Sequence, residues 1–344
     1  MARDLGHAVD EYPHIWANEW NTEKLGPATY AEFRGTTEAL FEKAEALAAA
    51  GGPDAAFGDL LPADTPWRAA IDSICGWITG GRLDQLSAVD VGRMDDLQVN
   101  WRLPGGYGAV IAALAEGLPL RLSTPVTRID WRDKTITVGT PAGSLTAERV
   151  IVTLPTNVIA AGTVAFAPDL PAAKLQAAAD LPLGADLKLF LAVEGAPFGP
   201  PRDLQLPSRY DRTDCAFMHL HPFGRPLVAA YLGGDIAREL EAAGLAAMAD
   251  FAEQELVFNF GSAVRGSLRA FAASGWMGDP LAGGAYSYAR PGALGARAGL
   301  AVPVDDRLYF AGEATSPGEY ATAHGAYMTG QVAGKAASAA FVAR

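Results

Sequence analysis

The chain has 344 residues, of which 50% are hydrophobic and 19% are charged, enough for one large domain or two interleaved ones. Its net charge of −12, without any lysine- or arginine-rich run, excludes nucleic acid and an anionic membrane surface as expected partners. Two cysteines, no apolar segment of signal-peptide type behind Met1 and no apolar run of transmembrane length predict a cytoplasmic enzyme without disulfides.

The first hundred residues are predicted to be mainly helical. Residues 37–50 carry apolar side chains at helical spacing and stop at Gly51-Gly52-Pro53, a sequence that ends helices. Residues 67–78 and 88–99 predict two further helices.

A glycine-rich turn and a group of short strands follow. Gly105 and Gly106 precede a predicted helix at 109–116, but no strand comes before them and Ile111 occupies the third glycine position, so they are not a dinucleotide fingerprint. Three runs, at 120–131, 135–139 and 145–154, predict an antiparallel meander whose apolar end enters a buried sheet.

A second unit of mixed character is predicted between Pro155 and about residue 289. It contains strand-like runs and one long helical run: strands at 187–193, 214–219, 227–232 and 266–272, and a helix at 236–259. Strand alternation places Asp186 and Lys188 on one face of the first of these strands.

The C-terminal segment predicts a strand at 308–311, ended by Gly312 and followed by Glu313 and a helix at 323–342. Gly330, Ala333, Gly334 and Ala337 share one face of that helix, which permits the close approach of another backbone or a flat ligand. The helix start would direct unpaired N–H groups towards Glu313. The pattern predicts a cofactor cradle; the alternative is a strand and helix that only pack together.

This segment resembles the C-terminal flavin-binding signature of the flavin amine oxidases (monoamine and polyamine oxidases), approximately L-Y-F-A-G-E-x-T-S and then G-T-V-H-G-A-Y-x-S-G. The matching positions are 308–313, Thr315, Ser316 and 322–327. The resemblance implies a mixed α/β (α+β) fold with a discontinuous FAD-binding domain of the amine oxidase / p-hydroxybenzoate hydroxylase type and an inserted substrate domain. The implied layout is a helical substrate-domain portion at 1–97, FAD-binding segments at 98–155 and 290–344, and the substrate-binding domain at 156–289.

The family's N-terminal βαβ unit, with its G-x-G-x-x-G loop for the pyrophosphate, has no counterpart in this sequence. Three explanations stay open: a fragment, a decayed homologue, or a split enzyme. In the last case a second chain supplies the segment; a homodimer is a further open alternative.

Site residues follow from the resemblance, position by position. It implies contact with FAD for Val126, Gly105, Gly106, Gly312, Glu313, Thr322 and Ala323, and catalytic or substrate-facing roles for Lys188, Tyr286, Trp276 and Thr322. By this resemblance, Lys188 would be linked to flavin N5 through a water molecule. Its sequence context alone instead predicts a solvent-facing lysine. Tyr286 and Trp276 are, by themselves, more typical of core aromatics.

Two departures from the family pattern bear on chemistry. Thr322 stands where many members carry the second aromatic wall of the amine cage, and Ala285 stands where some carry a flavin-linked cysteine. FAD is therefore expected to bind without a covalent link at that point. Cys215, His219 and His221 lack a fourth ligand, so no metal site is expected.

The predicted reaction is an amine oxidation. Hydride passes from the amine α-carbon to flavin, water hydrolyses the imine, and O2 reoxidises the flavin to give H2O2. The alternatives are a desaturase-type flavoenzyme and a truncated or split flavoprotein subunit without activity of its own.

Overall fold

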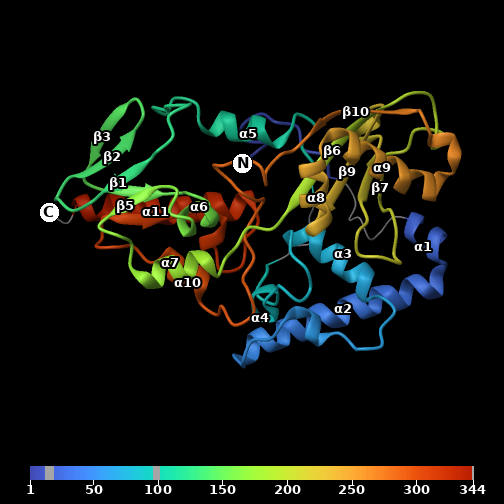
Figure 1. Cartoon of the computed structure of the whole chain (residues 1–344), viewed down its shortest axis with the longest axis horizontal. Helices are drawn as coiled ribbons and strands as arrows, with labels where there is room; N and C mark the ends of the chain where they lie inside the picture. The colour runs from blue at the N-terminus through green and yellow to red at the C-terminus, as the bar shows by residue number, and fades with distance from the viewer. Residues whose placement is uncertain (12–18, 96–100, 343–344) are drawn as a thin grey trace.

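The computed structural model describes residues 1–11, 19–95 and 101–342. The chain forms two lobes that lie side by side, with the C-terminus in one of them (Figure 1). One lobe holds a five-stranded sheet and the N-terminal helices; the other holds a four-stranded sheet, a two-stranded sheet and the C-terminal helix. Mixed helix and sheet layers of this kind are the predicted fold class.

The five-stranded sheet has the order β10-β6-β9-β8-β7, and every neighbouring pair is antiparallel. Its strands are β6 (Asp186–Val193), β7 (Leu204–Pro207), β8 (Phe217–Leu220), β9 (Leu227–Gly233) and β10 (Leu268–Ala273). Leucines 187, 189 and 191 of β6 are buried in the core, whereas Lys188 between them is exposed. Burial of each leucine stabilises the fold by about 1.5–3 kcal/mol. The leucine face of β6 is therefore held in the core, and Asp186 and Lys188 lie on the opposite face.

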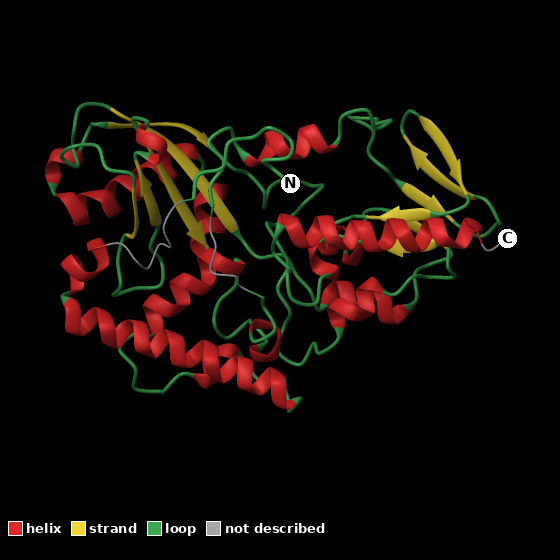
Figure 2. Cartoon of the chain, turned by 180° about the vertical axis from the view of Figure 1, so that it is seen from behind, coloured by secondary structure: helices red, strands yellow, loops and turns green. Residues whose placement is uncertain are grey.

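The helices of this lobe are α1 (Glu19–Leu25), α2 (Pro27–Ala50), α3 (Arg68–Thr79), α4 (Ala88–Val91), α8 (Asp235–Ala243) and α9 (Leu245–Phe260), with 3-10 turns at Phe57–Leu60, Pro222–Gly224 and Ser262–Val264. Helix α3 packs on one face of this sheet and α8 and α9 on the other, and further helices of this lobe lie outside α3 (Figure 2). Helix α2 ends at Gly51 in the left-handed conformation, as the sequence predicts.

Two helix predictions in this lobe were wrong in length. The helix expected at 88–99 is only the four-residue α4, because the chain turns at Gly92 where its backbone meets the carbonyl of Ala44; residues 96–99 lie outside the described residues. The helix expected at 236–259 is two helices, because Gly244 adopts φ 90° and ψ 176°, a conformation outside the helical region.

The other lobe confirms the meander but shortens its strands. Strands β1 (Arg128–Asp130), β2 (Ile136–Thr140) and β3 (Gly143–Ala147) are antiparallel, and β5 (Ala165–Ala167) joins β1 in parallel. The run at 120–131 is strand only in β1, with Leu118, Leu120 and Leu122 exposed before it. The run at 145–154 is divided, because β4 (Val150–Val152) leaves the meander and pairs in parallel with β11 (Leu308–Phe310).

Four helices flank the short sheets of this lobe: α6 (Thr156–Ala160), α7 (Ala172–Ala179), α10 (Ala296–Ala301) and α11 (Ala323–Val342), the last with the predicted bounds. One apolar core joins Ile129, Val158, Leu181, Leu300 and Phe310. Residues 156–181, predicted as the start of the substrate domain, therefore pack with the segment predicted to bind FAD. Helix α5 (Tyr107–Leu114) lies between the two lobes, near the top of Figure 1.

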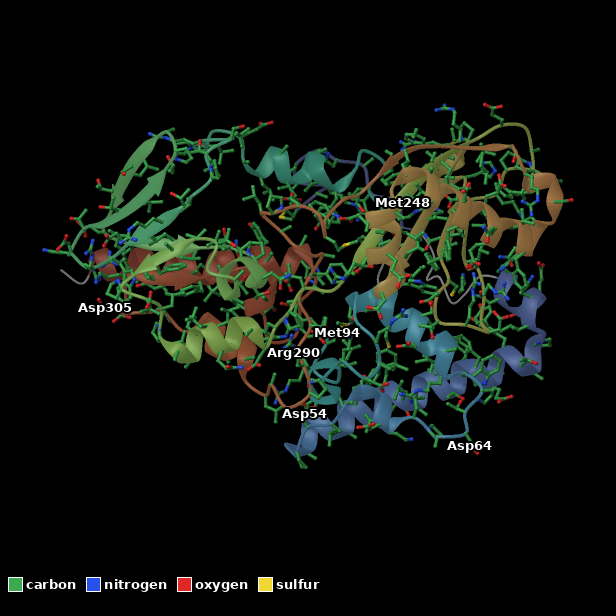
Figure 3. All side chains as sticks on the ribbon, viewed as in Figure 1. Asp54, Asp64, Met94, Met248, Arg290 and Asp305 are labelled. Atoms are coloured by element: carbon green, nitrogen blue, oxygen red, sulfur yellow. The ribbon has the colours of Figure 1, made fainter. Side chains whose placement is uncertain are left out.

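Polar contacts join the lobes near Asp54 and Arg290, which Figure 3 labels in the middle of the molecule. The Asp54 carboxylate accepts hydrogen bonds from the backbone N–H groups of Val89 (3.1 Å) and Gly292 (2.7 Å). Deeper inside, Arg297 of α10 donates to both carboxylate oxygens of Asp90 of α4, each at 2.8 Å. This buried pair fixes α4 against the C-terminal segment.

Candidate functional site

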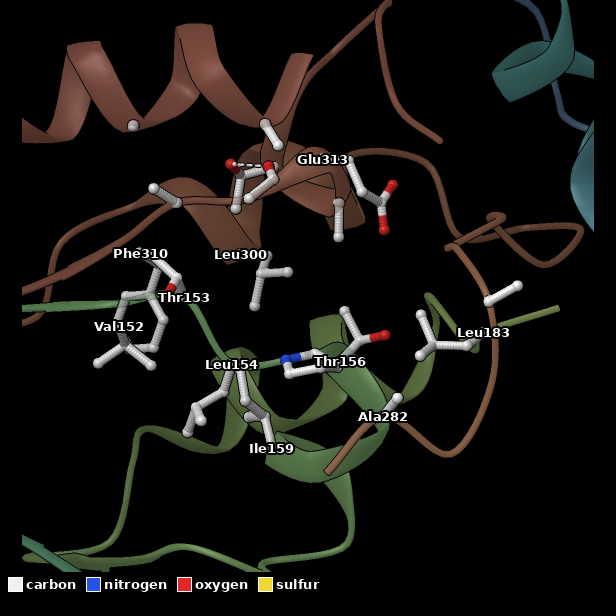
Figure 4. Close-up of a pocket in the computed structure, with 18 residues that line it drawn as sticks. Val152, Thr153, Leu154, Thr156, Ile159, Leu183, Ala282, Leu300, Phe310 and Glu313 are labelled. Carbon is white, nitrogen blue, oxygen red and sulfur yellow. Dashed lines mark hydrogen bonds between the residues drawn. The ribbon is translucent and has the colours of Figure 1, made fainter. Parts of the chain in front are cut away.

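A cavity of about 330 Å³ lies where β4 and β11 end and α6 and α11 begin (Figure 4). Its lining is mostly apolar, with a few hydroxyl groups and one carboxylate. The wall is formed by residues 152–156, Ile159, Leu183, Ala282, Ala285, Leu300, residues 310–315, Ala326 and Gly330. The strands β4 and β11 are parallel, and the cavity lies beyond their carboxyl ends, where open α/β sheets bind ligands.

Glu313 is the carboxylate of this cavity. It follows Gly312, whose φ of 138° turns the chain away from β11 into a short 3-10 turn at Glu313–Thr315. Its carboxylate accepts hydrogen bonds from Ser287 N (3.0 Å), Ser287 Oγ (2.8 Å) and Ala321 N (2.8 Å). Glu313 therefore fixes two segments at once: the loop that carries Tyr286 and the turn that leads into α11.

Helix α11 begins at the cavity. Thr322 caps it, because its Oγ1 accepts from Gly325 N at 3.0 Å. Among the described residues, no backbone hydrogen bond engages the N–H groups of Ala323 and His324. These N–H groups form the positive end of the helix, which favours a negatively charged ligand group.

Small residues of α11 bring the helix close to β11 and the cavity. Ala333 is buried against Tyr309 and Ala311 of the β11 segment, with Ala337 beside it, while Gly330 lines the cavity. The predicted small-residue face thus packs on the strand at two positions and leaves space for a ligand at a third.

Tyr286 and Lys188 both lie beside Tyr231, on the face of the five-stranded sheet opposite its leucine core. The Tyr286 hydroxyl lies 2.6 Å from that of Tyr231 on β9 and donates to the Trp77 carbonyl at 3.1 Å. Lys188 Nζ lies 5.1 Å from the centroid of the Tyr231 ring. Burial raises the pKa values of Tyr231 and Tyr286 well above the ordinary value for a phenol, so both stay neutral.

Ser287 connects this sheet face to the cavity. Its backbone N–H and hydroxyl donate to Glu313, and its hydroxyl oxygen accepts from Arg297 at 2.9 Å. The neighbouring Ala285 lines the cavity and offers no thiol, and both cysteines of the chain are buried in the other lobe's core.

Several predicted site residues lie away from this cavity. Gly105 and Gly106 precede α5 with open space beside them, and Val126 packs against the apolar core of its own lobe. Trp276 is 51% exposed in the loop after β10. The roles of these four residues stay predictions.

Sequence reasoning missed two parts of the site. One is the run from Thr153 to Thr156, which lines the cavity; its signal was the apolar run that ends at Pro155. The other is the polar pair of Asp186 and Tyr231 beside Tyr286; the alternation of β6 had placed Asp186 on the face of Lys188 without indicating a partner.

Comparison with known proteins identifies the family. The family described as "Flavin containing amine oxidoreductase" matches residues 41–337. The chain belongs to this family. Polyamine oxidase 2 of Arabidopsis thaliana is 33% identical over 243 residues, which are 67% of this chain and 49% of the plant protein. Lysine-specific histone demethylase 1 homolog 2 of the same plant is 30% identical, over 66% of this chain and 32% of that protein.

Solved structures of amine oxidases share the fold. Cyclohexylamine oxidase from Brevibacterium oxydans superposes with a TM-score of 0.75 and 20% identity, covering 100% of this chain and 84% of that one. A double mutant of putrescine oxidase gives a TM-score of 0.74 at 18% identity with the same coverage. The chain spans about half the length of the polyamine oxidases that it matches.

The described residues contain neither a membrane-spanning helix nor a cluster of metal ligands. No helix within residues 1–11, 19–95 and 101–342 is long and apolar enough to cross a membrane. In the same part of the chain, no three His, Cys, Asp or Glu side chains gather as a metal-binding group. Cys215 instead lies 3.0 Å from Ser73 Oγ, and His219 pairs with Asp203 at 2.7 Å.

Proposed function

We propose that this protein is an FAD-dependent amine oxidase that binds its cofactor non-covalently in the cavity between β4, β11 and α11. The observation that carries the proposal is the arrangement of that cavity: an apolar slot beyond the carboxyl ends of two parallel strands, lined by the Glu313 carboxylate and by Ala326 and Gly330 near the start of α11. Reduced flavin carries negative charge on its pyrimidine ring, and such a helix start favours that charge.

The residues present fit a flat, partly anionic cofactor. A Cβ added at Gly330 would meet no atom within 4 Å. Ala285 and Ala326, which also line the cavity, each add only a methyl group to its wall. FAD, when bound, supplies the two-electron oxidation; the protein supplies orientation and exclusion of water. Thr322 and Ala323 would hold the flavin end at the helix start, and Glu313 would position that helix start rather than carry a proton.

The amine would lie against the face that carries Tyr286 and Lys188. Tyr286 would form one wall of the amine site, and Thr322 would leave the opposite side less confined than a second aromatic ring does. Lys188 would place a positive charge where charge develops as O2 is reduced, after hydride has left the amine α-carbon. Water would hydrolyse the resulting imine to an aldehyde or ketone and ammonia or a smaller amine, and O2 would gain the two electrons and two protons removed from the amine and leave as H2O2.

A second reading is a flavoprotein subunit that needs a further chain for activity. The chain spans about half the length of the polyamine oxidases that it matches, so the activity of a whole polyamine oxidase is a proposal for it. In that reading the cavity accepts flavin only when a nucleotide-binding segment from another polypeptide is present.

Purification of the full chain tests the proposal directly. We expect a flavin absorption spectrum, either as isolated or after addition of FAD, and release of that flavin on denaturation, because no covalent link is formed. A panel of monoamines, diamines and polyamines should bleach the bound flavin without air and yield H2O2 in air. A folded, colourless chain that binds no added FAD would refute independent function and favour the subunit reading.

A further inference from the structure

Asp186 is a buried carboxyl group in an unusual position. It begins β6, points to the same face as Lys188 and is only 3% exposed. Both of its carboxylate oxygens are buried without a hydrogen bond that meets normal geometry among the described residues. An ionised carboxylate buried in this way would lose its hydration without replacement, at a cost of several kcal/mol.

The contacts of the neighbouring phenols with each other and with Trp77 can direct both phenol protons away from Asp186. The Trp77 carbonyl can only accept, so the 3.1 Å contact uses the single hydroxyl proton of Tyr286. The Tyr286 oxygen must then accept from Tyr231 across their 2.6 Å contact, which uses the proton of Tyr231. The proton that can complete this chain is the one on Asp186 itself, donated to a lone pair of a phenol oxygen.

Burial opposes the ionised form of Asp186 and outweighs Lys188 and the two phenols, which favour that form. Tyr231 and Tyr286 are the polar side chains that approach it, and Lys188, the cation that acts on it, has an exposed side chain directed over the Tyr231 ring. From α3 and α8, Asp72 and Asp235 face Arg82 instead, and Glu255 of α9 pairs with Arg212. Burial raises the pKa of Asp186 well above its ordinary value.

We propose that Asp186 is a positioning residue: as a neutral carboxylic acid it donates into the Tyr231–Tyr286 pair and holds the Tyr286 ring in place. All three protons of the chain then point in one direction, from Asp186 towards the Trp77 carbonyl. The hydroxyl of Tyr286 is thereby occupied, and the ring itself is what a ligand meets. The role of the Tyr286 ring as a wall of an amine site rests on the proposed function. The protonation state of Asp186 and the chain of hydrogen bonds are independent of it.

The stability of the full chain against pH tests the protonation state. Below about pH 3.9, the ordinary pKa of aspartic acid, Asp186 is protonated in both folded and unfolded chains. As the pH rises, the unfolded chain ionises first, so the unfolding constant of the wild type should rise relative to that of Asp186→Asn, by up to about tenfold per pH unit. The rise should end at the raised pKa of the folded chain.

Urea unfolding from about pH 5 to about pH 8 gives this ratio. Glu194→Gln, at the exposed far end of the same strand, is the matched control and should show a flat ratio. A ratio that is flat or falls with pH for Asp186→Asn would show an ionised carboxylate and overturn the proposal.

An infrared measurement needs no variant, and a circular dichroism measurement compares two folded variants. Infrared spectra of wild-type protein with 13C-labelled aspartate should contain the carbonyl band of a protonated, non-exchanging carboxylic acid at neutral pH. A spectrum with only carboxylate bands would refute the protonated state of Asp186.

Near-ultraviolet circular dichroism should report the packing of the tyrosine rings: Asp186→Asn keeps a hydrogen-bond donor and the signal, whereas Asp186→Leu loses both. An unchanged signal in Asp186→Leu would remove the positioning role. Neither measurement requires flavin or amine, so failure here and failure of the proposed function are distinguishable.

Discussion

At the scale of single residues, the two charged side chains of the candidate site, Lys188 and Glu313, lie in contrasting surroundings. Lys188 is exposed on a strand whose neighbouring leucines are fully buried, so its position costs little stability and its charge is available to solvent and ligand. Glu313 shows the opposite case: it lines the cavity, but its oxygens are occupied by three donors from two segments. A charged residue in a pocket therefore need not be the one that reacts.

Lys188→Met should slow reoxidation of reduced flavin by O2 and leave anaerobic reduction by the amine nearly unchanged, because the charge is needed only when oxygen is reduced. Stopped-flow measurement of the two half-reactions separates these steps. Arg269→Met, on the neighbouring exposed strand β10, is a control for loss of a surface cation. An oxygen reaction as fast as that of the wild type would remove the role assigned to Lys188.

Glu313→Gln should weaken flavin binding and lower the free energy of unfolding by about 1–3 kcal/mol, since a carboxamide presents N–H groups to donors that need an acceptor. Thermal unfolding and titration with FAD measure the two effects. The exposed Glu239→Gln on α8 should change neither. Weakened stability with unaltered FAD affinity would place Glu313 outside the cofactor site.

At the scale of elements, α11 shows why glycines of one helix are not equivalent. Gly325 lies in the first turn, where a Cβ would stand 2.0 Å from the Glu319 carbonyl oxygen, whereas a Cβ at Gly334 would meet no atom within 4 Å. The turn that ends in the Thr322 cap therefore requires glycine at 325, and helix propensity disfavours glycine at 334. The first position fixes how the helix start packs on the preceding turn, and the second does not.

Gly325→Ala should destabilise the protein by about 1–3 kcal/mol and weaken FAD binding, because the helix start must move. Gly334→Ala is the matched control and should stabilise the protein by up to about 1 kcal/mol through helix propensity alone. Chemical unfolding compares the two variants. Equal stability changes in both would mean that the close approach of Gly325 to Glu319 does not constrain α11.

At the scale of the whole molecule, one buried chain of polar contacts ties the two ends of the sequence together. Arg297 binds Asp90 through two hydrogen bonds, donates to Ser287, and stacks on Tyr320 with its guanidinium carbon 3.6 Å from the ring centroid. Ser287 in turn binds Glu313 at the cavity. The helical N-terminal part therefore supports the cavity without lining it.

Arg297→Leu should lower the free energy of unfolding by about 3–5 kcal/mol, because Asp90 is left as a buried charge without its partner. The double variant with Asp90→Leu should recover much of that loss, and the exposed pair Arg34–Glu38 should yield less than about 1 kcal/mol in the same experiment. Urea unfolding measures all of these. A small loss in Arg297→Leu would show that the connection between α4 and α10 does not depend on this pair.

The sequence by itself determined the family, the bounds of α11, the end of α2 and the composite motif at 308–327, because each depends on local periodicity, glycine positions or a contiguous pattern of residues. Strand lengths and the sheet to which each strand belongs could not be predicted as well from the sequence. No local pattern marks where β3 ends, or shows that β4 pairs with a strand more than 150 residues away. That pairing depends on which apolar faces find each other in three dimensions.

Only the tertiary structure decided the partners of Glu313, the link from Arg297 to Asp90, and the burial of Asp186 beside Tyr231 and Tyr286. The carboxylates of Glu313, Asp90 and Asp186 are chemically alike in the sequence. Their states differ because burial removes water from each of them, and the donors that replace it come from segments remote in the chain.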